Sequence, residues 1–341
     1  MHRKMTTLSK KIVIRVDGGQ IEEIGTGHII RMIALAKSLI TDGHQLFFIT
    51  RKDKNYKLGY NLLSKDLSCI TKGFFSNNLI NNSQEEVKLI LSLQPDIVIF
   101  DRFNTEKEVH QQLQSNNIKT ISFEDRGSGL SNADLIINAI FDDMPKKRNT
   151  KLGFQYLILP KTKIEHIKEP SKDVKNISIC MGGYDNRSLL KYIINNIPHI
   201  DTINYRYIIG DEVVYKNFAN ENKSKNIFFL HRPRNFHEII SDTDIAISAG
   251  GLTLFEYVSM GIPTIAIPQY EHQLANIDKL VKLKASLLGS NRLQLNATLL
   301  KDTLSKLIKN FDLRKELHQN AIDTIDRKGL KRVNKAITNL L

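Results

Sequence analysis

Tryptophan is absent from the chain, and only two cysteines occur, Cys69 and Cys180. Both cysteines lie beside apolar runs, which favours reduced, buried thiols over a disulfide framework or a cysteine-based zinc site. The histidines and carboxylates also lack the spacing of metal ligands. We therefore expect neither a metal ion nor another cofactor.

Long hydrophobic runs are missing as well, since no stretch approaches the ~18 apolar residues of a membrane-spanning helix. The opening residues, MHRKMTTLSK, are basic. The apolar run that follows them is too short for the core of a signal peptide. The predicted compartment is therefore the cytoplasm.

The charge is strongly positive, because 49 Lys and Arg residues outnumber 36 Asp and Glu residues to give +13. These basic residues are spread along the chain without an aromatic-interleaved patch, which argues against nucleic acid as a partner. The excess charge suits the attraction of an anionic small molecule, or peripheral association with an anionic membrane surface. We expect a monomer.

The chain of 341 residues is about twice the size of one compact domain. Apolar runs of strand length alternate twice with segments of helical period, which predicts an α/β protein of two doubly wound Rossmann-type domains. We place the connection in the stretch Met144–Lys172, rich in lysine and proline, so that the domains are residues 1–160 and 161–341 with a helical tail. The expected strands are Ile12–Asp17, Gln45–Thr50, Asp96–Phe100, Thr120–Phe123, Ala133–Asn138, Asn176–Met181, Tyr205–Ile209, Asn226–Leu230, Asp244–Ser248 and Thr264–Ile267. The clearest expected helices are His28–Thr41, Asn235–Ser241, Leu252–Met260 and Gln273–Leu283.

The loop Gly25-Thr26-Gly27-His28 follows the first expected strand and opens a helix. Ligands of open α/β sheets bind beyond the carboxyl ends of the strands, and glycines there let the backbone approach them closely. The positive end of the helix disfavours a charged imidazole, so His28 would stay neutral and able to accept a proton. A capping or packing histidine is the equally weighted alternative.

A second loop, Ser248–Thr253, carries paired glycines and a hydroxyl at a helix start. This pattern predicts a diphosphate site on the backbone amides of Gly251, Leu252 and Thr253. Glu256, one turn later, is placed to accept hydrogen bonds from a ribose diol. A solvated surface charge is the alternative for Glu256.

Two further loops are weaker candidates. Gly182 and Gly183 close the strand Asn176–Met181 and are followed by Asp185, for which a simple turn with a capping aspartate is the alternative. Gln273 and Asn276 are three residues apart and so share one helical face. Their amides suit sugar hydroxyls or phosphate oxygens, or they are ordinary surface residues.

Together these motifs resemble the two-domain nucleotide-sugar enzymes with the GT-B fold. Within that group the chain is most similar to the UDP-2,4-diacetamido-2,4,6-trideoxy-β-L-altropyranose hydrolases of pseudaminic acid biosynthesis and to the spore-coat polysaccharide proteins. The resemblance extends from about residue 11 to 290. It is carried by Arg15-Val16-Asp17, Ile24–His28 with Arg31, Asp101, Ala133–Asn138 and the glycine-rich motifs of the second half.

The resemblance implies two domains facing a central cleft, with the nucleotide mainly on the second domain. His28 then matches the general base that takes a proton from water attacking C1 of the sugar, with inversion and release of UDP. In the first domain Gly25, Gly27, Arg31 and Asp101 would border the sugar. The implied nucleotide contacts are Gly182, Gly183, Gly251, Leu252 and Thr253 around the diphosphate, Glu256 at the ribose, the loop 231–236 at the base, and Gln273 and Asn276 near the phosphate and sugar.

The chain departs from the usual motifs at three places. Phe103 follows Asp101-Arg102 where a tyrosine is usual, Tyr184 follows Gly182-Gly183 where a serine is usual, and Glu124-Asp125 replaces an Asp-Asp pair. A glycosyltransferase using the same cleft, or a non-catalytic nucleotide-sugar-binding partner, is therefore an alternative to the hydrolase. A lipid acceptor would require an exposed apolar patch, for which Gly73-Phe74-Phe75 is the one first-domain candidate, although we expect these phenylalanines in the core.

Overall fold

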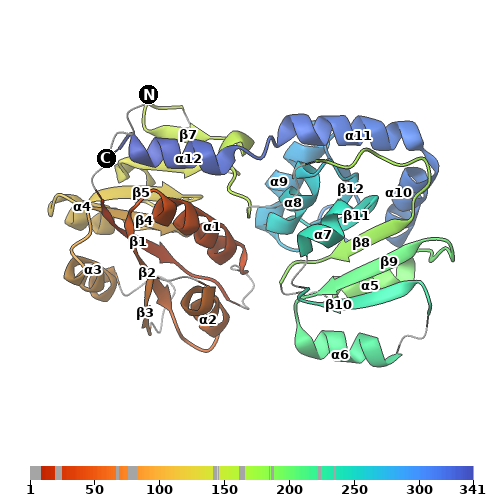
Figure 1. Cartoon of the computed structure of the whole chain (residues 1–341), viewed down its shortest axis with the longest axis horizontal. Helices are drawn as coiled ribbons and strands as arrows, with labels where there is room; N and C mark the ends of the chain where they lie inside the picture. The colour runs from red at the N-terminus through yellow and green to blue at the C-terminus, as the bar shows by residue number, and fades with distance from the viewer. Residues whose placement is uncertain are drawn as a thin grey trace. The chain divides into compact units, whose positions relative to one another are not determined.

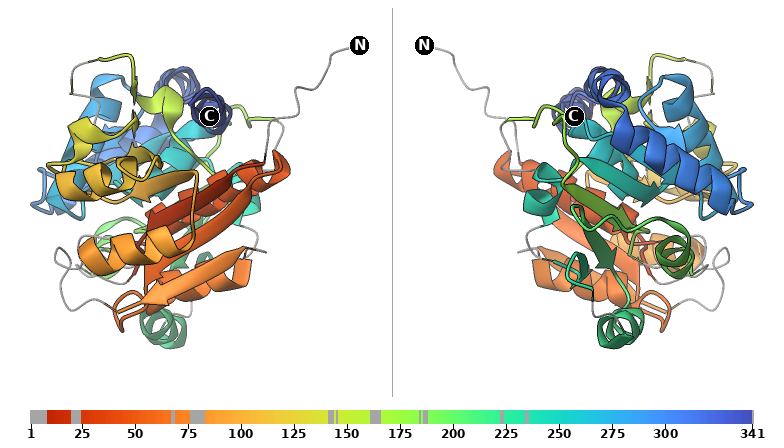
Figure 2. Two further views of the ribbon diagram at one scale, coloured as in Figure 1. Left: turned by 90° about the vertical axis from the view of Figure 1, so that its left-hand side faces the viewer. Right: turned by 90° about the vertical axis from the view of Figure 1, so that its right-hand side faces the viewer.

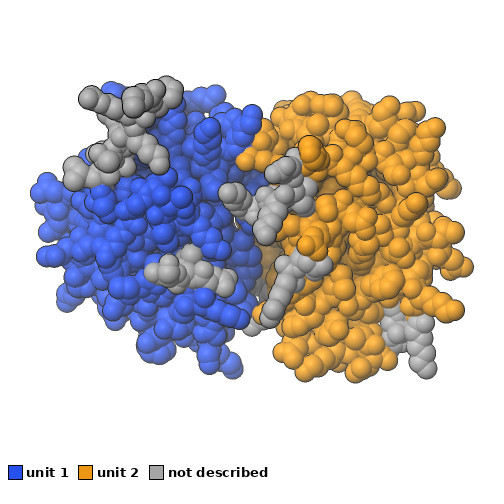
Figure 3. Space-filling view, viewed as in Figure 1, with its two compact units in different colours: residues 1–160, 328–341 blue, residues 161–327 orange. Residues whose placement is uncertain are grey.

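The computed structural model describes residues 9–19, 25–66, 69–75, 83–140, 144, 146–160, 166–183, 185, 188–221, 224–233 and 236–340. The chain divides into two compact units, residues 1–160 with 328–341 and residues 161–327 (Figure 3). Each unit is a parallel sheet covered by helices, so the predicted α/β class and the two doubly wound sheets are confirmed. No helix among the described residues is both long and apolar enough to cross a membrane.

The first unit is built on a sheet with the strand order β3-β2-β1-β4-β5-β6-β7 (Figure 1). Neighbouring strands pair in parallel throughout. Successive side chains of a strand point to opposite faces, so Ile12 and Ile14 enter one core cluster and Val13 enters another. The strands are β1 (Lys11–Val16), β2 (Gln45–Arg51), β3 (Ile70–Phe74), β4 (Ile97–Asp101), β5 (Lys119–Phe123), β6 (Leu135–Asn138) and β7 (Thr150–Leu152).

Helices cover both faces of this sheet (Figure 2). The face of Ile12 and Ile14 packs against α1 (Gly27–Thr41), α2 (Lys57–Asp66) and α12 (Gly329–Thr338). The face of Val13 packs against α3 (Ser83–Ser92) and α4 (Lys107–Gln114). The strands are thus buried on both sides, as their nearly continuous apolar runs predict.

The second unit repeats this plan with the strand order β10-β9-β8-β11-β12-β13. Helices α5 and α10 pack on one face, and α7 and α8 on the other. The strands are β8 (Asn176–Cys180), β9 (Asn204–Ile209), β10 (Ile227–His231), β11 (Ile245–Ala249), β12 (Thr264–Ile267) and β13 (Leu287–Leu288). The helices are α5 (Leu189–Asn196), α6 (Glu212–Glu221), α7 (Phe236–Ser241), α8 (Leu252–Ser259), α9 (Glu271–Lys282), α10 (Ala297–Lys309) and α11 (Phe311–Thr324).

The C-terminal tail differs from the sequence-based division of the chain. Residues 328–341 were assigned to the second domain, whereas in the structure they pack on the first unit. The reason is apolar burial, because Val333, Ala336 and Ile337 of α12 belong to the core cluster of Ile12. The helical character of the tail was predicted, but its partner was not.

The sequence also did not predict three short strands at the edges of the two sheets. Strand β7 lies inside the stretch predicted to connect the domains, and β3 and β13 were not expected. Phe74 at the end of β3 is buried as expected, but the neighbouring Phe75 is 62% exposed and was wrongly placed in the core. Cys180 is buried, whereas Cys69 is only half-buried.

Candidate functional site

Each sheet has one point at which the strand order reverses, between β1 and β4 in the first unit and between β8 and β11 in the second. Strands on the two sides of such a point send their loops in opposite directions, which opens a crevice at the carboxyl edge. His28 and Asp101 lie at the first reversal. Gly182 and Gly251 lie at the second. These sequence-predicted residues therefore lie at the two reversal points, where open α/β sheets generally bind ligands.

His28 forms a hydrogen-bonded pair with Asp101. His28 is the second residue of α1, and Asp101, the last residue of β4, is fully buried. The distance from His28 Nδ1 to Asp101 Oδ1 is 2.7 Å. An ionised carboxylate only accepts hydrogen bonds, so Nδ1 carries the proton and donates it. The lone pair of Nε2 is then available to accept a proton.

Arg31 keeps Asp101 ionised. Burial alone would raise the pKa of Asp101, but the charges and hydrogen bonds of Arg31 and His28 outweigh it and lower the pKa to about 2. Arg31 Nε donates to Asp101 Oδ2 at 2.7 Å, and Arg31 Nη2 donates to Asp101 Oδ1. Nη2 also lies 3.1 Å from His28 Nδ1, a contact between charge and ring, since the Nδ1 proton is directed at Asp101. Arg31 is itself buried, with 6% of its surface exposed.

Phe103 packs against the imidazole ring of His28. The rings of Phe103 and His28 meet edge to face, with centroids 4.9 Å apart and planes at 82°. This contact is a favoured aromatic geometry. The phenylalanine that replaces the usual tyrosine thus retains a ring beside His28 and lacks the hydroxyl.

Two helix N-termini are open to an anion. Helix α1 starts after Thr26, whose side chain accepts no hydrogen bond from the helix, and helix α8 starts after Gly251, which has no side chain to cap it. A Cβ atom built on Gly25, Gly182 or Gly251 would meet no atom within 4 Å, so there is space beside these backbones. Gly27 is the first residue of α1. Unsatisfied amides with free space in front of them favour negatively charged groups.

Contacts within the protein already occupy part of the loop that begins with Gly182 and Gly183. Gly182 adopts the left-handed conformation (φ 84°). A Cβ on Gly210 would lie 2.2 Å from the carbonyl oxygen of Gly183, so these two backbones pack closely. Asp185 accepts hydrogen bonds from Leu189 N and Leu190 N, each at 2.8 Å, and therefore caps α5. The capping alternative for Asp185 is confirmed.

Gln273 and Asn276 are buried residues of α9, which contradicts the surface alternative. Gln273 Oε1 accepts hydrogen bonds from Gln269 N at 2.8 Å and Gly250 N at 3.2 Å, and so holds the glycine loop. Asn276 Oδ1 is buried and has no hydrogen-bond partner among the described residues. A buried acceptor without a donor is costly, and a ligand hydroxyl or amide would satisfy it.

Glu256 is half-buried, which contradicts the alternative of a solvated surface charge. Burial raises the pKa of Glu256 to about 8, with no offsetting charge or hydrogen bond from the described residues. The neighbouring Thr253 hydroxyl contacts Cys180, whose pKa burial raises to about 12. Glu256 is thus a carboxyl group that needs hydrogen-bond donors, such as those of a diol.

A buried ion network that the sequence did not suggest ties β1 to β4. Asp17 accepts hydrogen bonds from Arg15 Nη1 and Nη2 at 2.6 and 2.8 Å, and Arg15 Nε donates to Glu86 at 2.6 Å. Arg102, next to Asp101, donates to Glu86 at 2.9 Å. Arg15 and Asp17 were named only as part of a shared motif, and their pairing was not predicted because charged side chains are expected at the surface. The network supports the turn that carries Asp101 and Phe103.

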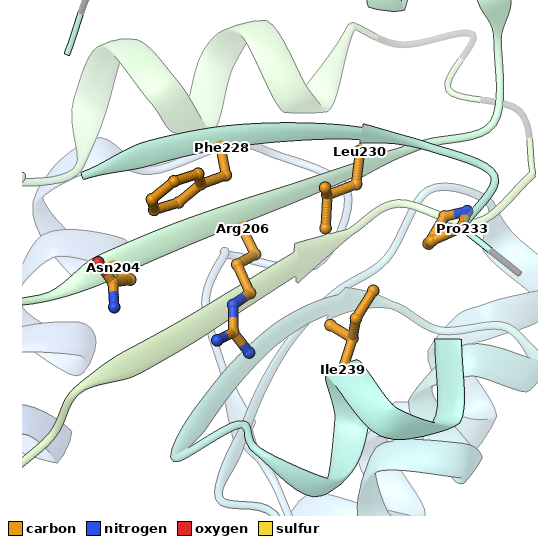
Figure 4. A pocket seen from close by; sticks show the side chains of 6 residues that line it. All are labelled: Asn204, Arg206, Phe228, Leu230, Pro233 and Ile239. Carbon is orange, nitrogen blue, oxygen red and sulfur yellow. The ribbon is translucent and has the colours of Figure 1, made fainter. Parts of the chain in front are cut away.

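A pocket of about 290 Å³ lies between β9, β10 and the start of α7 (Figure 4). Arg206 in it pairs with Asp242 at 2.7 Å, and Phe228 is 42% exposed. Of the segments predicted to bind nucleotide, only the loop 231–236 reaches it, through Pro233. The pocket is lined by Asn204, Arg206, Phe228, Leu230, Pro233 and Ile239.

Comparisons with known proteins agree with this architecture. Residues 184–335 match the glycosyltransferase family 28 C-terminal domain. The chain is 26% identical over 344 residues to the spore coat polysaccharide biosynthesis protein SpsG of Bacillus subtilis (strain 168), covering 96% of this chain and 97% of that protein.

Two solved structures show the same fold. MurG of Acinetobacter baumannii superposes with a TM-score of 0.70 at 16% identity, covering 97% of this chain and 99% of its own. The spinosyn rhamnosyltransferase SpnG, in complex with thymidine diphosphate, gives 0.66 at 12% identity, covering 96% and 99%. With two doubly wound parallel-sheet units and a family 28 C-terminal domain match over residues 184–335, the chain has the GT-B glycosyltransferase fold.

Proposed function

We propose that this chain is a nucleotide-sugar enzyme of polysaccharide biosynthesis that hydrolyses a UDP-activated amino or deoxy sugar at C1 and releases UDP. The observation that carries the proposal is the His28–Asp101 pair, which presents an unprotonated Nε2 at a strand-order reversal. The similarity to SpsG, named for spore coat polysaccharide biosynthesis, supports the pathway. The thymidine diphosphate bound to SpnG supports a nucleoside-diphosphate ligand.

In this mechanism His28 Nε2 accepts a proton from the water that attacks C1. Asp101 stabilises the imidazolium that forms and keeps the proton of Nδ1 in place. A positioned base of this kind contributes roughly 10²–10⁴-fold to a rate. Arg31 and Asp101, both buried, act through His28, while Gly25 leaves room beside the start of α1, where Gly27 is the first helical residue.

UDP leaves from the second unit. The amides of Gly251, Leu252 and Thr253 at the uncapped start of α8 bind its diphosphate, and the helix dipole stabilises the charge that develops as the C1–O bond breaks. Gly182 and Gly183 border the same crevice. Glu256 accepts hydrogen bonds from the ribose, and the open acceptor of Asn276, beside Gln273, binds the sugar or phosphate region.

The second candidate function is a glycosyltransferase, in which His28 activates an acceptor hydroxyl instead of water. The match of residues 184–335 to the glycosyltransferase family 28 C-terminal domain supports this candidate no more than it supports the hydrolase. A non-catalytic nucleotide-sugar-binding role is the third candidate. All three functions use the same residues to bind the nucleotide sugar. A measurement of nucleotide-sugar binding therefore does not distinguish them, whereas a measurement of turnover does.

The test is incubation of the purified protein with a panel of UDP-sugars, with and without acceptors, while UDP release is measured. Release without an acceptor that is lost in His28→Ala supports the hydrolase, and release that needs an acceptor supports the transferase. Binding of UDP-sugar without turnover supports the third role. His44→Gln is the matched control, because His44 is a buried histidine of the same unit. It directly precedes β2 and so lies at the amino ends of the strands, whereas His28 lies at their carboxyl ends. Full activity in His28→Ala would contradict the assigned base.

A further inference from the structure

Glu124 is an unusual residue that the proposed reaction leaves without a role. It directly follows β5, its side chain is buried, and its backbone has a φ of 50°. A left-handed conformation in a residue other than glycine costs free energy, and such residues concentrate at functional sites. The strained backbone therefore points to a requirement for the position of this carboxylate.

The Glu124 carboxylate connects β6 with α1. Oε1 accepts a hydrogen bond from Ala139 N at 2.9 Å, and Oε2 accepts one from Ile140 N at 3.3 Å. Oε1 also lies 3.7 Å from Arg31 Nη1. Burial raises the pKa of Glu124, while Arg31 and the two backbone donors offset part of that effect. Two amides thus anchor the carboxylate, and Arg31 is its charged partner.

Arg31 is shared between two carboxylates. Its Nη1 faces Glu124, while its Nε and Nη2 bind Asp101. Asp101 in turn accepts the Nδ1 proton of His28. The four side chains therefore form a row of alternating charge that begins at Glu124 and ends at the imidazole.

We propose that Glu124 is a positioning residue that holds the Arg31 guanidinium and thereby sets the tautomer of His28. Without the Glu124 charge, the full charge of Arg31 acts on Asp101 and on the imidazole 3.1 Å from Nη2. Both effects weaken the attraction of Asp101 for the His28 proton. Glu124 is 2% exposed, so it acts through Arg31 and not on a substrate. The catalytic consequence rests on the proposed function, whereas the effect on His28 does not.

The experiment is therefore ¹⁵N NMR of histidine-labelled protein, with the His28 signals assigned by His28→Ala. In the wild type we expect the tautomer protonated at Nδ1. In Glu124→Gln we expect a mixture of tautomers, because Arg31 then competes more strongly with the His28 Nδ1 proton for Asp101. Unchanged His28 signals in Glu124→Gln would overturn the proposal.

Asp134→Asn is the matched control, since Asp134 is also a first-unit carboxylate that accepts a backbone hydrogen bond and pairs with a basic side chain, but it lies before β6, at the amino ends of the strands. It should leave the His28 tautomer as in the wild type, and an equal change in this variant would also overturn the proposal. Glu124→Asp restores the charge and should return the tautomer toward that of the wild type, which keeps the test valid where Glu124→Gln does not fold. If UDP release is found, Glu124→Gln should lower kcat with little change in KM. Absence of turnover would contradict the proposed function alone, because the NMR result stands without it.

Discussion

At the scale of single residues, the chemistry of this protein depends on how burial and charge set proton positions. Asp101 stays ionised although it is buried, because Arg31 and His28 lower its pKa to about 2. Glu256 is in the opposite situation. Burial raises its pKa to about 8, and no charge or hydrogen bond from the described residues offsets this effect. Two carboxyl groups of similar intrinsic acidity thus have different charges at neutral pH, which suits different roles.

Replacement of Asp101 tests the first of these roles. Asp101→Asn removes the ionised acceptor, so His28 loses the fixed Nδ1 proton and the stabilised imidazolium. We expect UDP release to fall by roughly 10²-fold or more, within the range of general-base catalysis. Steady-state kinetics measures the change, and circular dichroism checks that the fold is kept. Wild-type kcat in a folded Asp101→Asn protein would contradict the role of the pair.

The titration of Glu256 predicts how nucleotide binding depends on pH. Below its pKa of about 8 the free carboxyl group is mostly protonated, whereas a ribose diol prefers the ionised acceptor. Binding therefore favours proton loss, and the affinity for UDP should rise as the pH increases from 7 to 9. Isothermal titration calorimetry across this range measures the trend. Glu256→Gln should bind more weakly at pH 9 and lose the trend, and an identical pH dependence in this variant would refute the ribose contact.

At the scale of elements, a buried arginine holds the corner between α10 and α11. Arg314 is 1% exposed, and its Nη1 donates to the carbonyl oxygens of Leu307 at 2.6 Å and Ile308 at 2.9 Å. Its Nη2 donates to those of Ser171 and Lys172 at 2.7 and 2.6 Å. Arg314 thus donates hydrogen bonds to carbonyl groups in the last turn of α10, which lack partners within a helix. It also connects the segment before β8 to this helix.

Removal of this arginine should destabilise the second unit. Arg314→Leu leaves four carbonyl groups without this donor, and each unsatisfied group costs roughly 1–3 kcal/mol, so we expect a loss of about 4 kcal/mol or more in the free energy of unfolding. Urea denaturation measures this loss. Lys315→Ala, at an exposed neighbouring position of α11, should change stability by less than about 0.5 kcal/mol. Equal stability of the two variants would show that the carbonyl contacts do not matter.

The elements that the sequence predicted are those with strong local patterns. The central strands are continuous apolar runs bounded by glycine, proline or aspartate, and their positions could be predicted closely. β7 reads Thr-Lys-Leu and β3 reads Ile-Thr-Lys-Gly-Phe, so these edge strands lack such a pattern. The glycine loops could be predicted as ligand sites, because their function depends on local backbone geometry. The pairing of His28 with Asp101, 73 residues apart, is a property of the folded sheet and was not predicted, since Asp101 entered only through a family resemblance and as a residue near the sugar.

At the scale of the whole molecule, the chain passes between its two units twice, after residue 160 and again after residue 327. The second passage returns α12 to the first unit. A polar residue of α12 also forms hydrogen bonds with this unit. Asn334 Nδ2 donates to Ser38 Oγ and to Asp42 Oδ2. The first unit is therefore completed by the last residues of the chain, and its stability depends on them.

A core substitution in α12 tests this dependence. Ile337 is fully buried among residues of the first unit, so Ile337→Ala should lower the stability of that unit by roughly 2–5 kcal/mol through lost burial and a cavity. Hydrogen exchange resolves the two units, and we expect faster exchange in β1, β4 and α1 with unchanged exchange in β8 and β11. Lys335→Ala, at an exposed position of the same helix, should leave both units unchanged. Faster exchange confined to the second unit would instead place the tail where the sequence-based division assigned it, because a helix stabilises the core into which its apolar side chains are packed.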